Sequence, residues 1–196
     1  LTNGTFAVAN NLTMNTTSDI NRSGGSITGN LQGTGRYNVT YTGNSKTTGV
    51  ELAVSGNTTQ GLNNLTVSLT PGQTLTLDQN RTPDGDLTIT SGTFDLSTFT
   101  FNRSAATGTM SVSVTLRLGN NTGGQAGSNF PTNFTPTLTG GTVEYYRVGI
   151  QTVYSTPTYG NLTLSGSGTK TFGGSTTING TLAINSSAEA GLTNGT

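Results

Sequence analysis

The stretch DGDLTITSGTFDL, residues 84–96, repeats one pattern twice and predicts the fold. In each half a glycine is followed by a polar residue and then by an apolar, polar, apolar triplet, first at Leu87 to Ile89 and then at Phe94 to Leu96. Such alternation is typical of a β-strand with one buried face. The same phrase recurs as TNGTFAV, ending at Val8, and as TINGTLAI, ending at Ile184. We therefore expect short strands separated by glycine turns along the whole chain.

The recurring phrase favours a β-solenoid, in which the short strands of successive turns lie one above another. Similar triplets then recur because they stack, whereas repeats of a β-sandwich, the alternative fold, have no comparable reason to reuse one phrase. The expected fold class is therefore all-β, a β-helix-like solenoid of stacked rungs. The side chains expected to point inward are Phe6, Val8, Leu87, Ile89, Phe94, Leu96, Leu182 and Ile184, with Thr5, Asp86, Thr93 and Thr181 facing outward.

The composition is poor in charge and in apolar residues and rich in Gly, Thr, Ser and Asn. Only 30% of the residues are hydrophobic and 8% are charged, and the formal net charge is zero. A chain with so few apolar residues can build only a thin core, and outward Thr and Asn can form hydrogen-bonded ladders from rung to rung. The sequence has no basic stretch of the kind that nucleic acid or an anionic membrane attracts. We expect no nucleic-acid partner and no membrane insertion.

The side chains that usually carry enzyme chemistry are scarce. The sequence contains no His and no Cys, which removes the commonest general base and the thiolate nucleophile. Glu51, Glu144 and Glu189 stand alone among neutral neighbours, and the close pair Asp84 and Asp86 lies in a turn. Because hydrolysis of a glycosidic bond needs two carboxylates that flank it, the sequence predicts neither an enzyme nor a cofactor.

The chain divides into three parts by composition. Residues 1–118 and residues 137–196 are expected to be solenoid segments, and the Gly, Asn and Pro-rich residues 119–136 between them an excursion or a linker. The pentapeptide LTNGT occupies residues 1–5 and again residues 192–196, an offset of 191 residues. This match predicts that the chain is one unit of a longer tandem array, although so biased a composition can also produce it by chance.

One turn has the alternating oxygen ligands of a calcium loop. In DQNRTPDGD, residues 78–86, polar side chains occupy every second position, but the downstream bidentate Glu of an EF-hand is missing. The phrase TTINGT places Asn179 and Thr181 where this turn has Asp84 and Asp86, which favours a repeated turn in polar variants. We expect no metal site, and the alternative is calcium bound by Asp78, Asn80, Asp84 and Asp86.

Aromatic residues gather in one part of the sequence. The tyrosines lie around a single arginine and could form a hydrogen-bonding contact surface for a glycan or a neighbouring subunit. The alternative is that half of them pack inward, as strand alternation requires. The residues of this candidate contact surface are Tyr145, Tyr146, Arg147, Tyr154 and Tyr159.

Two segments resemble a known group of proteins. Residues 142–187, which include YGNLTLSGSGTKT, resemble repeats found in very large secreted surface proteins of Bacteroidetes and related bacteria, and residues 64–102, which include DGDLTITSGTFDL, are similar to the same material. Such proteins are regarded as β-solenoid or β-sandwich adhesins. The resemblance implies an extracellular or cell-surface location and supplies no catalytic residues.

These observations predict a mechanical role. Neutral, charge-poor surfaces lack the repulsion that keeps soluble proteins apart, and strand edges accept further strands. We expect a structural component of an extracellular filament, sheath or cell-surface stalk that self-associates into a homopolymer or tandem array. The alternatives are an adhesin module that binds a glycan or a host surface through its tyrosines, and a phage or autotransporter fibre of the same architecture.

Overall fold

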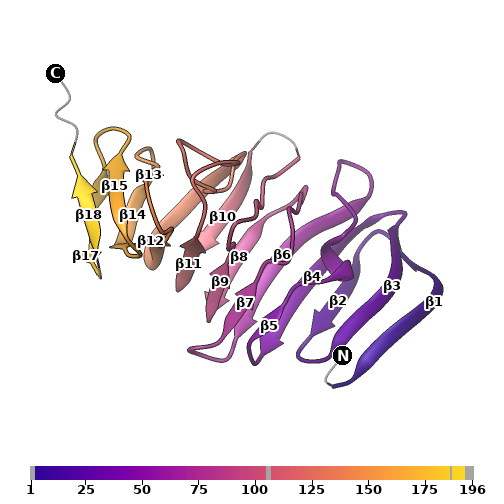
Figure 1. Ribbon diagram of the computed structural model, residues 1–196. Coiled ribbons are helices and arrows are strands. Elements are labelled where there is room, and N and C mark those ends of the chain that lie inside the picture. Colours follow the sequence, from indigo (N-terminus) through magenta and orange to yellow (C-terminus); the bar gives the residue numbers. More distant parts are fainter. Residues whose placement is uncertain (1–2, 105–106, 186, 193–196) are drawn as a thin grey trace.

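The computed structural model describes residues 3–104, 107–185 and 187–192 and is an all-β solenoid of about nine turns. The predicted fold class is therefore confirmed. Figure 1 shows the chain advancing in sequence order from one end of the stack to the other, so the first and last described strands lie far apart. Within the described residues, each pairing between two strands is parallel.

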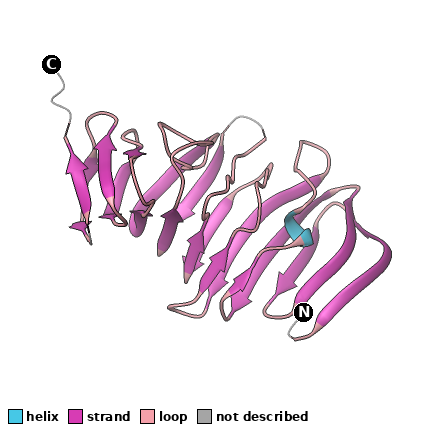
Figure 2. Cartoon of the chain, viewed as in Figure 1, coloured by secondary structure: helices cyan, strands magenta, loops and turns pink. Residues whose placement is uncertain are grey.

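The strands form several series, and within each series neighbouring strands are parallel and stacked one above another (Figure 2). The series that we call the first face contains β2 (Ser18–Arg22), β4 (Arg36–Gly43), β6 (Gly61–Leu69), β8 (Leu87–Ser91), β10 (Gly108–Val112), the first parts of β12 (Phe134–Tyr145) and β14 (Thr158–Leu164), and β16 (Thr177–Ile178). The second face contains β5 (Lys46–Thr47), β7 (Thr74–Thr76), β9 (Thr93–Asp95), β11 (Thr115–Leu118), the second parts of β12 and β14, and β17 (Leu182–Ile184).

The remaining strands form two short sheets that complete the turns. One pairs β1 (Thr5–Met14) with β3 (Ser26–Gly33), and the other orders β13 (Gln151–Val153), β15 (Gly168–Phe172) and β18 (Ala188–Gly191). A single 3₁₀ turn, η1 (Val50–Leu52), is the one helical element among the described residues. It carries two buried residues, Glu51 and Leu52, into the interior.

The turns differ in sequence length. Directly paired residues are 19 positions apart between Gln151 and Lys170 and 27 apart between Thr115 and Thr142. The longer turn contains residues 119–136, across which β11 and β12 remain paired. The stack of strands therefore continues across this segment. The segment is also ordered against the core, because Phe130 is buried and its backbone bridges Gln125.

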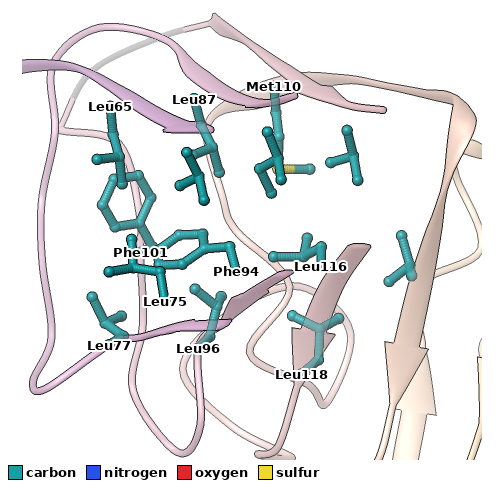
Figure 3. Close-up of a cluster of buried hydrophobic side chains, with 14 of the residues drawn as sticks. Leu65, Leu75, Leu77, Leu87, Phe94, Leu96, Phe101, Met110, Leu116 and Leu118 are labelled. Carbon is teal, nitrogen blue, oxygen red and sulfur yellow. The ribbon is translucent and has the colours of Figure 1, made fainter. Parts of the chain in front are cut away.

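Apolar side chains of successive turns lie over one another and form columns, as Figure 3 shows for the middle of the stack. Stacking in register buries these side chains because each turn covers the one below. The column of the second face runs Leu75, Phe94, Leu116, Val143, Leu162 and Leu182. The column of the first face runs Ile20, Val39, Leu65, Leu87 and Met110.

The recurring phrase does not stack only on itself. Phe94 and Leu182 share a column, but Leu87 lies on the first face and Phe6 pairs with Ile27 in the β1–β3 sheet. The phrase therefore occurs where a glycine turn leads into a strand with one buried side. Such strands lie on different faces of the solenoid.

Burial of the predicted inward residues depends on where they lie along the stack. Leu87, Ile89, Phe94 and Leu96 are fully buried, which confirms the prediction for the middle turns. The prediction is wrong at the ends, where Phe6 is 47% exposed, Leu182 42% and Ile184 49%. Because these three side chains belong to the end strands β1 and β17, no further described turn covers them.

Polar side chains form ladders on the outside, as predicted. Asn38 donates a hydrogen bond to Asp19 one turn below, at 2.9 Å, and accepts one from Asn63 one turn above, at 3.0 Å. A column of hydroxyl residues also follows the first face, but within the described residues no side chain of the protein bonds to their hydroxyl groups. Its members are Thr40, Thr66, Thr88, Ser111 and Thr137.

Candidate functional site

The predicted calcium loop binds protein groups of neighbouring turns. Asp78 forms an ion pair with Arg81 at 2.7 Å and accepts a hydrogen bond from the hydroxyl of Thr48. Burial opposes ionisation of Asp78, but the Thr48 hydroxyl and the Arg81 guanidinium outweigh it and lower the pKa of this carboxyl. Asp84 is buried and pairs with Arg36 at 3.1 Å.

The other two positions of this loop accept hydrogen bonds from the next turn. The Asn80 side chain accepts from the backbone N–H of Thr100 at 2.9 Å, and Asp86 accepts from that of Thr109 at 2.7 Å. Among the described residues, no group of three or more acidic side chains lies close enough to hold a metal ion. The loop thus ties three turns together, and calcium binding there stays the alternative to the predicted absence of a metal site.

The predicted tyrosine surface is split by strand alternation. Tyr145 and Tyr159 are fully buried, and their hydroxyl groups lie 3.0 Å apart in the core. Tyr154 packs against Phe130 with ring centroids 5.1 Å apart, and its backbone N–H donates to the Tyr145 hydroxyl. Burial raises the pKa of both core tyrosines. The prediction that Tyr145 and Tyr159 belong to a contact surface is therefore wrong, and the alternative of inward packing holds for these two.

The other three members, Tyr146, Arg147 and Tyr154, are partly buried and reach the surface only in part. The Tyr146 ring lies under the guanidinium of Arg117, 4.2 Å from the ring centroid, and its hydroxyl donates to Asp95 at 2.8 Å. Arg147 donates to Asn120 at 3.4 Å. Both side chains are partly buried. They are held by partners within the chain, which leaves a much smaller contact surface than the sequence predicts.

A ladder of charges on the second face was not predicted. Arg117 lies in register between Asp95 and Glu144 and forms ion pairs with both, at 3.0 and 2.7 Å. Burial opposes the charge of Arg117, but Glu144 and Asp95 outweigh it and raise its pKa. These residues are separated by 22 and 27 positions in the sequence, so the ladder becomes visible only when the register of the turns is known.

Two charged side chains, Glu51 and Lys170, are completely buried among the described residues. Glu51 is fully buried and binds Arg22, which is also buried, and it accepts a hydrogen bond from the Tyr41 hydroxyl. Lys170 is fully buried as well, and its ammonium donates to backbone carbonyls that include Arg147 and Ser167, each at 2.9 Å. The sequence carries a signal for Lys170, since it lies two positions before the buried Phe172 and so on the same strand side.

The two ends of the solenoid expose apolar groups. Of the six large apolar side chains that are exposed among the described residues, four lie at the ends of the described stack and only Val148 and Ile150 lie elsewhere, in a loop. At the C-terminal end, a pocket of about 500 Å³ opens on the core. Its lining consists of Phe172, Ile178, Leu182, Leu192 and the loop of residues 173–176.

The strands at both ends also have a free edge. Within the described residues, β1 and β2 each pair with one strand, and so do β16, β17 and β18. Such edges present unpaired backbone N–H and C=O groups that accept another strand. The candidate functional site of this chain is therefore the pair of end surfaces.

Comparisons with family models, with curated proteins and with solved structures gave no match for this chain. In the part of the chain that the structure describes, no helix has the length and apolar character needed to cross a membrane.

Proposed function

We propose that this chain is a structural component of an extracellular filament, sheath or cell-surface stalk that self-associates through its β surfaces. The observation that carries the proposal is the combination of free strand edges and exposed apolar side chains at both ends of one continuous stack. A stack of parallel turns extends as each turn is added, because every turn contacts only its neighbours. A solenoid therefore becomes longer by the stacking of turns alone, and no other kind of secondary structure is needed.

The surface chemistry supports the same proposal. The formal net charge is zero, and the side walls carry neutral Thr, Ser and Asn columns. With little charge to repel a neighbour, copies approach one another at ordinary salt concentrations. The extracellular location rests on the resemblance of residues 64–102 and 142–187 to secreted surface repeats.

Self-association is testable with the purified chain. We expect the sedimentation coefficient to rise with protein concentration, and electron micrographs of concentrated samples to show elongated particles. The same measurements in increasing salt control for charge, and we expect little change because few charges are exposed. Monomers that stay dispersed at the highest concentration reached would contradict the proposed function.

A further inference from the structure

We infer that a second copy of this chain binds end to end, with its β1 placed on the β16 and β17 edge of the first copy. We call the edge formed by β16, β17 and β18 the tail surface, and the edge formed by β1 and β2 the head surface. The inference rests on the proposed self-association and adds which surfaces meet and in which register.

No turn among the described residues covers the apolar side chains of the tail surface. In the column of the second face, Leu162 is fully buried beneath Leu182, whereas Leu182 itself is 42% exposed. In the neighbouring column, Leu164 is buried and Ile184 above it is exposed. Both columns therefore end on apolar side chains, and a strand placed over them in parallel would bury them as each earlier turn is buried.

The head surface supplies a strand that already fits such an edge. Inside the chain, β1 pairs with residues 26–31, which read SITGNL, and Phe6 lies opposite Ile27 while Leu12 lies opposite Leu31. The tail surface presents TINGTL at residues 177–182. Both segments place an isoleucine four positions before a leucine, with a glycine between them.

The irregularity of β1 matches this spacing. Six positions separate Phe6 from Leu12 but only four separate Ile27 from Leu31, because the register shifts between Val8 and Asn11. Ile178 and Leu182 are also four positions apart. The same shift therefore lets β1 of a second copy place Phe6 over Ile178 and Leu12 over Leu182.

The same alignment also sets the position of Thr5 of the second copy. Thr5 of the second copy then lies over Thr177, which is also a hydroxyl residue. Within its own chain the Thr5 hydroxyl lies 3.1 Å from the hydroxyl of Ser26.

Disulfide cross-linking tests this register, because the chain has no cysteine of its own. Neighbouring parallel strands are about 4.8 Å apart, which is within the Cα separation of about 4.4–6.8 Å that a disulfide spans. We expect a mixture of Thr5→Cys and Thr177→Cys chains to form a covalent dimer on oxidation, and we expect neither variant alone to do so. Dimers of Thr5→Cys alone would show that two head surfaces meet and would overturn the inference.

Blocking one end separates this inference from the proposed function. We expect Leu182→Asp to weaken association at least about tenfold, because it places an unpaired charge in the contact. Ile150→Asp, at an exposed apolar site away from both ends, is the matched control and should leave association unchanged. The end-to-end contact is overturned if Leu182→Asp associates as strongly as the wild type, or if the associated chains give no cross-link between Thr5→Cys and Thr177→Cys. The proposed function stands in either case. A wild-type chain that never associates overturns both.

Discussion

Leu116 lies directly opposite Phe94 on the neighbouring turn, 22 positions later in the sequence, and both side chains are fully buried. The Phe94 ring also meets Phe101 edge to face, with centroids 5.5 Å apart. A single turn is too thin to bury such residues alone, so each apolar side chain depends on the turns above and below it. The energetic unit of this protein is therefore the contact between neighbouring turns.

The first prediction compares two leucines of one column. Leu116→Ala should lower the free energy of unfolding by about 2–5 kcal/mol, because it leaves a cavity between two covering turns. Leu182→Ala, at the exposed end of the same column, should cost about 1 kcal/mol or less in dilute protein. Urea denaturation of both variants measures the difference, and equal losses would show that burial in the column does not set stability.

The second prediction concerns the buried pair of Arg22 and Glu51. Glu51→Gln should lower the free energy of unfolding by about 3–5 kcal/mol, because Arg22 is left buried without its counter-ion. Glu189→Gln, at an exposed site, serves as the control and should change it by less than about 0.5 kcal/mol.

The same pair should show coupling in a double-mutant cycle. The variant that combines Arg22→Met with Glu51→Leu should lose less stability than the sum of the two single substitutions, since no buried charge is left unpaired. Additive losses would mean that the two side chains do not interact in solution.

The third prediction concerns Lys170, whose ammonium fills a cage of backbone carbonyls. Lys170→Met should lower the free energy of unfolding by about 2–3 kcal/mol, because several buried carbonyl groups lose their donor. The matched variant is Lys46→Met, where the side chain is only partly buried and water can replace it, so the loss should stay below about 1 kcal/mol. A Lys170→Met chain as stable as wild type would show that the cage is not needed.

The fourth prediction is a pH dependence at Asp78. The pKa of Asp78 in the folded chain lies below its ordinary value of 3.8, so the folded state binds this proton more weakly than the unfolded state. The stabilisation is then complete above that ordinary value and is lost as the pH falls through the folded-state pKa. The difference in melting temperature between wild type and Asp78→Asn should be constant at neutral pH and shrink in acid. A difference that grows in acid would contradict the ion pair.

The sequence predicted the strand pattern better than the contacts between strands. Alternation alone placed Leu87, Ile89, Phe94 and Leu96 correctly, because a strand of period two sends every second side chain inward. The same rule applied to Tyr145 and Tyr146 separates them onto opposite sides, although grouping them by sequence proximity predicts one surface. Local pattern thus decides the direction of a side chain but not its neighbours.

The sequence did not reveal the register, that is, which residues of successive turns lie opposite one another. Because the separation between paired residues varies from 19 to 29 positions, no fixed period reveals that Arg117 lies between Asp95 and Glu144. The isolated Glu51 gave no sign that it meets Arg22, since the 3₁₀ turn that carries it inward has no periodic signal. The exposure of Leu182 likewise follows from its place at the end of the stack.

Oriented fibre diffraction of the assembled protein tests the central claim that copies extend one continuous stack of turns. End-to-end binding places the spacing between strands along the filament axis, so the account predicts a strong reflection at about 4.7–4.9 Å on the meridian. The same reflection on the equator would mean that the stacks lie across the filament and associate side by side, and it would contradict the account.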